Sequence, residues 1–134
     1  MQEPEKIKIV IADDHAVFRD GLRFLIQREK NMEIVGEAAT GRDLLLCVEQ
    51  QQPRLIITDL VMPLLSGLEA IREIVVRFPT VRIIALSSFD HEQLIIEALK
   101  MGAQGYIIKN APKGEIIHAI RTVLQGLPYY CIQP

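Results

Sequence analysis

Short apolar runs alternate along the chain with segments whose apolar residues recur every three or four positions. Such runs are typical of buried strands, and the recurring spacing is typical of amphipathic helices. The runs predict strands at residues 7–12, 33–39, 55–59, 82–87 and 106–109. The recurring spacing predicts helices at residues 16–29, 42–51, 66–78, 90–101 and 114–125. Five strand–helix units therefore follow one another.

Capping residues support several of these boundaries. Ser66 and Glu69 have the spacing of a capping box, which predicts the start of the third helix. Asp90 is a suitable N-cap for the fourth helix, and Gly102 and Gly126 follow the last two helices as stop signals.

The central strands are continuously apolar rather than alternating, as in IKIVIA, LIIT and IIAL. Strands buried on both faces have this pattern, which favours a parallel sheet with helices on each side. The segment at 33–39 is weaker and interrupted by a glycine, so we expect it at or near an edge of the sheet.

Composition limits the class of protein. The chain has 134 residues, of which 49% are hydrophobic and 24% charged, so it suits a single globular domain. The net charge is −2 and no basic patch is evident, which argues against direct binding of nucleic acid. No apolar run is long enough to span a membrane. Cys47 and Cys131 are widely separated, and we expect both to be reduced thiols of a cytoplasmic protein.

Polar side chains follow the strands that we expect at the centre of the sheet. The first strand ends in Asp13 and Asp14, the third in Asp59, the fourth in Ser87 and the fifth in Lys109. Because ligands of such sheets bind beyond the carboxyl ends of the strands, these groups should share one crevice.

The chemistry of this group of residues points to phosphoryl transfer. Three carboxylates brought together repel one another, and a hard cation such as Mg²⁺, which prefers oxygen ligands, relieves the repulsion. Asp59 can act as a nucleophile on phosphorus, since aspartyl phosphates are known covalent intermediates. Lys109 would supply a second cation, and the Ser87 hydroxyl could donate to a phosphoryl oxygen.

The segments ADDH, DLVMP, ALSS and GYIIK each follow or form a predicted strand. Together they resemble the receiver domain of bacterial two-component response regulators, over about residues 7–126. The segments ADDHAVFRDGL and GAQGYIIK are most similar to the LuxR-type (NarL/FixJ-like) subgroup. The resemblance implies a flavodoxin-like doubly wound (βα)5 fold, with a parallel five-stranded sheet in the order 2-1-3-4-5.

The resemblance also implies roles for single residues. Asp59 matches the phosphoacceptor. Asp13 and Asp14 match the acidic pair that binds Mg²⁺ (or Mn²⁺) together with Asp59 and the backbone carbonyl of Val61.

Three further positions match residues that respond to the phosphoryl group. Ser87 matches the switch hydroxyl and Lys109 the family's lysine. Tyr106 matches the aromatic residue that turns inward on activation, although a tyrosine on a short strand is also a common half-buried packing residue.

For the whole protein, the resemblance implies a receiver at residues 1–126, and a linker or C-terminal tail that begins at residues 127–134. The partner would be a sensor histidine kinase, with a homodimer formed on phosphorylation and no membrane contact. DNA would be bound only through a helix-turn-helix domain that is absent from this chain. The domain would not be a conventional enzyme.

Other readings are less well supported by the residues. A phosphatase of the haloacid-dehalogenase type needs a second aspartate two positions after the nucleophile, where Val61 stands. A dinucleotide-binding domain needs glycines after the first strand, and ADDHAV has none. A stand-alone or phosphorylation-independent receiver that acts by protein binding stays open. The sequence also leaves open whether the Lys109–Asn110 peptide bond is cis or trans.

Overall fold

Six parallel strands form one sheet in the computed structural model, which describes residues 5–88 and 92–130. Their order across the sheet is β2-β1-β3-β4-β5-β6. The strands are β1 (Ile7–Ala12), β2 (Met32–Ala38), β3 (Leu55–Asp59), β4 (Arg82–Ser87), β5 (Gly105–Ile108) and β6 (Tyr129–Tyr130). The predicted flavodoxin-like order of the first five strands is therefore confirmed, and a short sixth strand extends it.

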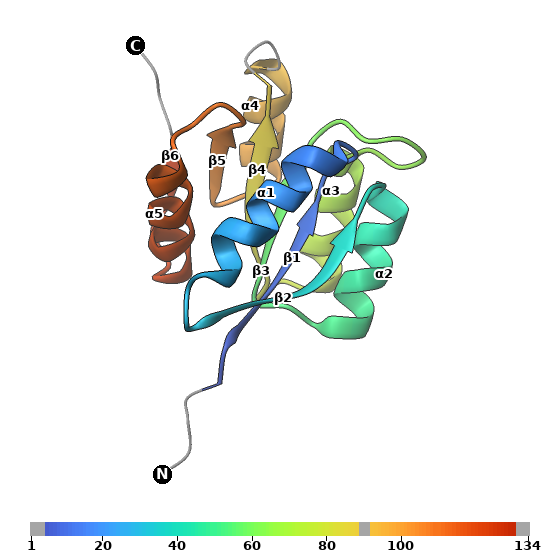
Figure 1. Ribbon diagram of the computed structural model, residues 1–134. Helices are drawn as coiled ribbons and strands as arrows, with labels where there is room; N and C mark the ends of the chain where they lie inside the picture. The colour runs from blue at the N-terminus through green and yellow to red at the C-terminus, as the bar shows by residue number, and fades with distance from the viewer. Residues whose placement is uncertain (1–4, 89–91, 131–134) are drawn as a thin grey trace.

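Helices cover both faces of the sheet (Figure 1). Two of them, α1 and α5, pack on one face, and the other three pack on the opposite face. The helices are α1 (Ala16–Gln27), α2 (Gly41–Gln51), α3 (Gly67–Arg77), α4 (Glu92–Met101) and α5 (Lys113–Leu124). Every strand pairs in parallel with its neighbours, so the carboxyl ends of the strands meet at one edge of the sheet.

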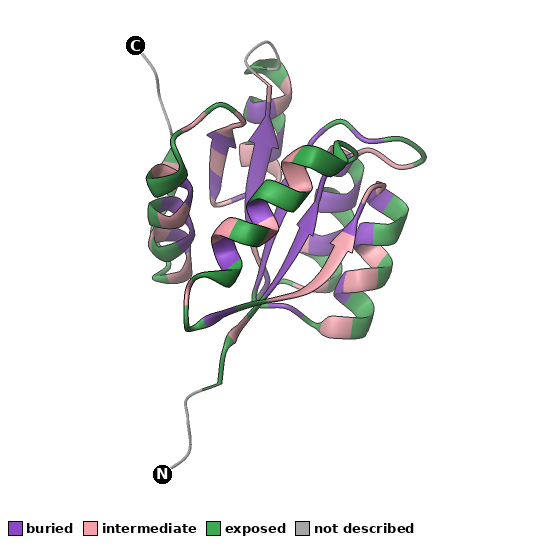
Figure 2. Ribbon diagram, viewed as in Figure 1, coloured by how far each residue is buried: buried purple, intermediate pink, exposed green. Residues whose placement is uncertain are grey.

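The core lies on both sides of the central strands, which are coloured as buried in Figure 2. Alternate residues of β1 point to opposite faces, so Val10 packs with the α2–α3–α4 layer while Ile9 and Ile11 pack with α1 and α5. This explains why the strands carry no polar alternation in the sequence.

Strand β2 lies at one end of the sheet, as its weaker pattern predicted. Its pairing with β1 shifts between Ile9 and Val10, where Ile34 and Gly36 are the successive partners, so Val35 is left as a bulge. Arg19 and Arg23 of α1 both bind the carboxylate of Glu37, which ties the first helix to this strand.

Predicted boundaries differ from the observed ones by one or two residues at several helices. Helix α1 ends at Gln27 because the backbone N–H of Glu29 turns back to the carbonyl of Ile26. Ser66 caps α3 as predicted, since its hydroxyl accepts the backbone N–H of Glu69 at 3.1 Å. The predicted cap Asp90 lies outside the described residues.

Strand β6 was not predicted. It falls in the segment that the sequence suggests as a linker or tail, and its two residues pair with Gly105 and Tyr106 of β5. The Tyr129 hydroxyl donates to the carboxylate of Glu115 on α5 at 2.9 Å. The division of the chain at residue 126 itself stays a prediction.

Two remaining expectations concern membranes and thiols. None of the helices in the described ranges combines the length and the apolar character needed to cross a bilayer.

Cys47 is a free, half-buried thiol, and burial, with a smaller contribution from Asp43, raises its pKa. Cys131 lies outside the described residues.

Candidate functional site

The carboxyl ends of β1, β3 and β5 bring two acids and one amine into contact. Asp13 follows β1, Asp59 is the last residue of β3, and Lys109 follows β5. The ammonium nitrogen Nζ of Lys109 lies 2.7 Å from Oδ2 of Asp59 and 2.9 Å from Oδ2 of Asp13. The sequence predicted this convergence, and we call Asp13, Asp14, Asp59 and Lys109 the acidic site.

Asp13 is held in place by contacts to both of its carboxylate oxygens. Its side chain is fully buried, and Oδ1 accepts the backbone N–H of His15 at 2.8 Å. Oδ2 has the close ionic contact with Lys109 but accepts no aligned hydrogen bond within the described residues. Together with the oxygens of Asp14 and Asp59, this carboxylate provides the oxygen ligands that Mg²⁺ prefers.

Asp59 is buried and oriented by its neighbours. Its Oδ1 accepts the backbone N–H of Val61 at 3.1 Å, while Oδ2 binds Lys109. Behind it, Gly67 opens α3 so close to β3 that a Cβ there would overlap the carbonyl oxygen of Asp59. The predicted role of the Val61 carbonyl as a metal ligand stays a prediction.

Lys109 is positioned by backbone pairing and by an aromatic ring. Its backbone N–H donates to the carbonyl of Ser87 at 2.9 Å, and Nζ lies 5.1 Å from the centre of the Phe18 ring. Burial lowers the pKa of its ammonium group, but the interactions with Asp59 and Asp13 outweigh burial, so the pKa is raised. The lysine is therefore a fixed positive charge. The Lys109–Asn110 peptide bond is trans.

Ser87 and Tyr106 lie beside the acidic site, on β4 and β5. Ser87 is fully buried, and its hydroxyl donates to the carbonyl of Ser88 at 3.0 Å. Tyr106 is half-buried, pairs with Ala85 of β4, and its ring stacks on that of Tyr130 with centroids 6.4 Å apart. Their predicted switch roles stay predictions.

His15 belongs to the same cluster. It is the N-cap of α1 and its side chain is 68% exposed, yet Nδ1 lies 3.1 Å from Asp13 and 3.4 Å from Asp14. Ligand atoms of Asp13, Asp14, His15 and Asp59 all lie within 4.8 Å of one another. Its position directly after the acidic pair was the available signal.

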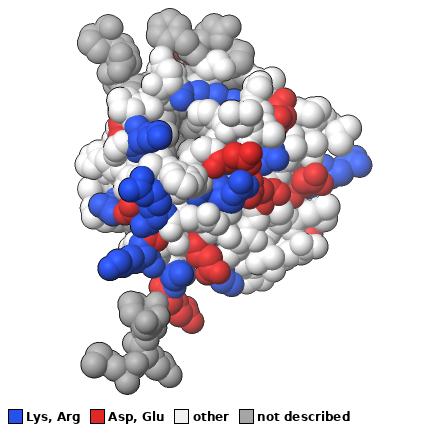
Figure 3. Space-filling model, viewed as in Figure 1, with Lys and Arg blue, Asp and Glu red and all other residues white. Residues whose placement is uncertain are grey.

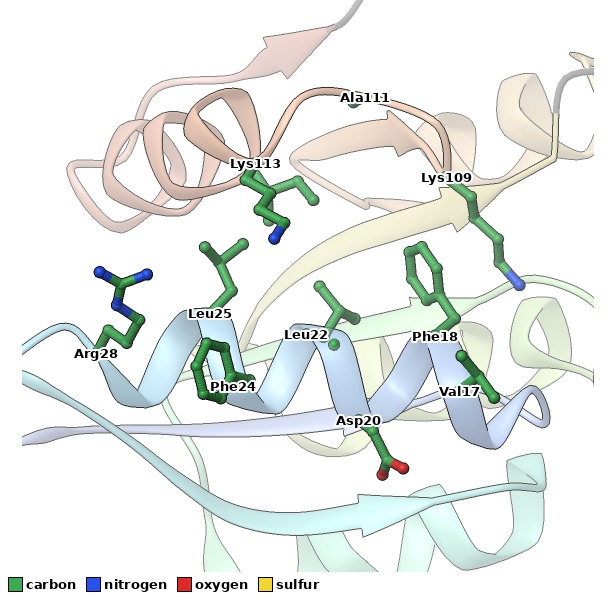
Figure 4. A pocket seen from close by; sticks show the side chains of 12 residues that line it. Val17, Phe18, Asp20, Leu22, Phe24, Leu25, Arg28, Lys109, Ala111 and Lys113 are labelled. Carbon is green, nitrogen blue, oxygen red and sulfur yellow. The ribbon is translucent and has the colours of Figure 1, made fainter.

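An open groove of about 550 Å³ begins at Lys109 and runs between α1 and α5 (Figure 4). Most of the α1 side chains that line it are apolar, with Val17 and Phe24 exposed by 87% and 66%, and Asp20 and Arg28 add charge. Charges of both signs are interspersed over the face shown in Figure 3 rather than gathered in one basic patch.

Comparison with known proteins agrees with this geometry. The family model described as the response regulator receiver domain matches residues 9–121. The oxygen regulatory protein NreC of Staphylococcus carnosus is 45% identical over 124 residues, which are 92% of this chain and 57% of NreC. The chain thus spans little more than half the length of that relative.

Solved structures lead to the same family. A LuxR-family two-component response regulator from Aurantimonas has a TM-score of 0.87 and 29% identity, covering 93% of this chain and 89% of that one. The signal receiver domain of NarL from Mycobacterium tuberculosis has a TM-score of 0.84 and 28% identity, covering 92% and 99%. The chain belongs to the response regulator receiver domain family, among its LuxR-type members.

Proposed function

We propose that this domain accepts a phosphoryl group on Asp59 and thereby switches an output. The observation that carries the proposal is the contact of the buried Asp59 carboxylate with Lys109, beside the buried Asp13. A structural ion pair would need one acid for one lysine. Here two buried acids contact a single ammonium group, and the negative charge left over favours a cation that could bind a phosphoryl group.

In the proposed transfer, a carboxylate oxygen of Asp59 attacks the phosphorus of a phosphohistidine. The new P–O bond forms as the P–N bond breaks, and its electron pair returns to the imidazole of the donor. Lys109 stabilises the charge on the transferring oxygens because its ammonium group already lies 2.7 Å from Asp59. The Val61 N–H holds the other carboxylate oxygen in position.

The domain would bind Mg²⁺ (or Mn²⁺) through Asp13, Asp14, Asp59 and the carbonyl of Val61. When bound, the ion neutralises negative charge on the phosphoryl group. The grouping of ligand atoms from Asp13, Asp14 and Asp59 within 4.8 Å of one another supports this assignment.

Switching would start at Ser87. Its hydroxyl, which donates to the Ser88 carbonyl, would turn to a phosphoryl oxygen. The space that it leaves would be filled by Tyr106, and the face formed by α4, β5 and α5 would change shape. Such a change is a shift between two pre-existing populations that the phosphoryl group biases.

The donor would be a sensor histidine kinase docked over α1. A donor must bring its phosphohistidine to Asp59, so it has to contact the surface around the acidic site. The groove between α1 and α5 starts at Lys109 and presents Val17 and Phe24 to such a partner. A cytoplasmic location is part of this proposal.

The output would be a homodimer and a DNA-binding domain beyond the receiver. Relatives such as NreC are longer than this chain, which supports a further domain. The receiver promotes its own phosphorylation and dephosphorylation and has no other proposed enzymatic activity. The alternative is a receiver that signals by protein binding without phosphorylation.

Incubation with acetyl phosphate and Mg²⁺, followed by intact mass measurement, tests the proposal. We expect one added phosphoryl group on the wild-type chain and none on Asp59→Asn, while Asp43→Asn, an exposed acid on α2, should still be modified. Absence of any adduct on the wild-type chain, with this donor or with phosphorylated kinase, would refute the proposal and favour the binding-only alternative.

A further inference from the structure

His15 places a nitrogen donor at the mouth of the acidic site. Its Nδ1 lies 3.1 Å from Oδ1 of Asp13 and 3.4 Å from Oδ1 of Asp14. The contact is not a by-product of helix capping, because the His15 side chain makes no capping hydrogen bond to α1.

The spacing of the donor atoms suits one shared ion. Opposite ligands of an octahedral ion lie about 4.2 Å apart, twice a metal–ligand distance of about 2.1 Å. The ligand atoms of Asp13, Asp14, His15 and Asp59 lie within 4.8 Å of one another, so the widest separation exceeds this span by about 0.6 Å at most. The fully buried Asp13 already has a cation beside it, because Oδ2 lies 2.9 Å from the ammonium nitrogen of Lys109, and a divalent ion bound here would share this carboxylate with the lysine.

The Nδ1 atom of His15 can turn its lone pair toward a positive charge. It lies 3.1 Å from the ammonium nitrogen of Lys109, which has no lone pair to offer and can only donate. With the proton on Nδ1 the ring donates to Oδ1 of Asp13, and with the proton on Nε2 the same atom instead accepts from Lys109. A divalent ion bound among the carboxylates would replace that donor at the same lone pair.

We infer that His15 is a further ligand of the metal site, and that it gives this site a preference for first-row transition ions over Mg²⁺. The inference rests on the metal site of the proposed function. Magnesium prefers an all-oxygen shell, whereas imidazole nitrogen suits ions such as Ni²⁺ and Co²⁺ and is accepted by Mn²⁺. The nitrogen donor therefore raises the affinity of the site for these transition ions more than its affinity for Mg²⁺.

Calorimetric titration of the full chain with Mg²⁺ and with Ni²⁺ tests the preference. In His15→Ala we expect the dissociation constant for Ni²⁺ to rise roughly 10-fold or more, comparable to the loss of a metal's supporting partner. The constant for Mg²⁺ should change by less than about twofold. His118→Ala, which removes an exposed histidine on α5, should leave both constants unchanged.

Pulsed electron paramagnetic resonance of bound Mn²⁺ reports the coordination directly. We expect nitrogen coupling from a coordinated imidazole in the wild type and in His118→Ala, and its loss in His15→Ala. An unchanged ratio of Ni²⁺ to Mg²⁺ affinity in His15→Ala, or Mn²⁺ bound without nitrogen coupling, would overturn the inference and leave the proposed function standing. If the wild-type chain bound none of these ions, the metal site of the proposed function would fail as well.

Discussion

At the scale of single residues, Lys109 occupies the space between two carboxylates that are almost completely buried. Its ammonium group neutralises part of the charge of Asp13 and Asp59 and so holds the ends of β1, β3 and β5 together. It also competes with a divalent ion, since the ammonium group and the metal would interact with the same carboxylate oxygens of Asp13 and Asp59. The lysine therefore has opposite effects on folding and on metal affinity.

Replacement of this cation should separate the two effects. In Lys109→Met we expect the free energy of unfolding without metal to fall by about 2 kcal/mol or more, because two buried acids lose their partner. The affinity for Mg²⁺ should rise several-fold, since a repulsion of about 1 kcal/mol is removed. Urea unfolding and calorimetry measure these changes. Lys113→Met, on the exposed start of α5, is the control, and weaker Mg²⁺ binding in Lys109→Met would contradict the argument.

The convergence of Asp13, Asp59 and Lys109 was predictable because parallel strands bring their carboxyl ends to one edge. The contact of His15 with this group was not predictable from the sequence. Whether an exposed side chain at a helix N-cap turns toward the sheet depends on local rotamers and on contacts with Asp13 and Lys109, which lie on two different elements. The direction of the Ser87 hydroxyl could not be predicted either, because it also depends on a local rotamer.

At the scale of elements, the entry of α3 sets the shape of the acceptor site. Gly67 begins this helix directly against the backbone of Asp59 and Leu60, which leaves no room for a side chain. Leu64, in the same connection, has a positive φ of 68°. The connection from β3 to α3 is therefore fixed by close backbone packing as well as by the Ser66 cap.

A methyl group at this point should be costly. Gly67→Ala is expected to lower the free energy of unfolding by about 2–4 kcal/mol, because neither the Asp59 carbonyl nor Leu60 can move without breaking the sheet. Gly114→Ala, also in the first turn of a helix but with nothing within 4 Å of the added Cβ, should be neutral or stabilising. Chemical denaturation of both variants compares them, and equal effects would refute the packing argument.

The exposed apolar side of α1 leads to a prediction about the partner. Val17→Asp should reduce phosphotransfer from the cognate kinase at least about tenfold, since a charge would have to be buried in the contact. The rate with acetyl phosphate should be unchanged. Val76→Asp on α3 is the matched control, because Val76 is exposed by 77% and lies on the opposite face of the sheet. Equal loss with both donors would argue against docking on α1.

Element boundaries differed in how far the sequence could specify them. Strands β1, β3 and β4 were predicted to the residue because continuous apolar runs end abruptly at polar residues. Helix ends were less certain, since α1 ends in a turn at Glu29 and α5 starts after Pro112 rather than at Gly114. Strand β6 carries no such pattern, because two tyrosines become a strand only through pairing with β5.

At the scale of the whole molecule, one sheet separates two cores. The layer of α1 and α5 and the layer of α2, α3 and α4 each bury their own apolar cluster against it. The carboxyl ends of the strands are thus supported from both sides, which keeps the acidic site rigid. This layering followed from the apolar strands, and the weak pattern of β2 indicated one edge of the sheet, whereas β6 at the other edge could not be foreseen.

The two edges of the sheet are protected against pairing with another chain in different ways. On one side, β2 carries the charges of Glu33 and Glu37 and a bulge, which discourage pairing with another chain. On the other side β5, with the sequence GYII, has no charge of its own, and β6 covers its backbone at Gly105 and Tyr106. The cover is only two residues long.

Removal of this cover should turn β5 into a template for a second chain. A chain shortened to residues 1–126 is expected to show concentration-dependent self-association in sedimentation velocity, which the full chain should not show. If the shortened chain sediments as a monomer over the same concentrations, β6 has no such protective role. If the shortened chain does self-associate, the pairing of Tyr129 and Tyr130 with β5 protects the domain against aggregation, and this role is separate from signalling.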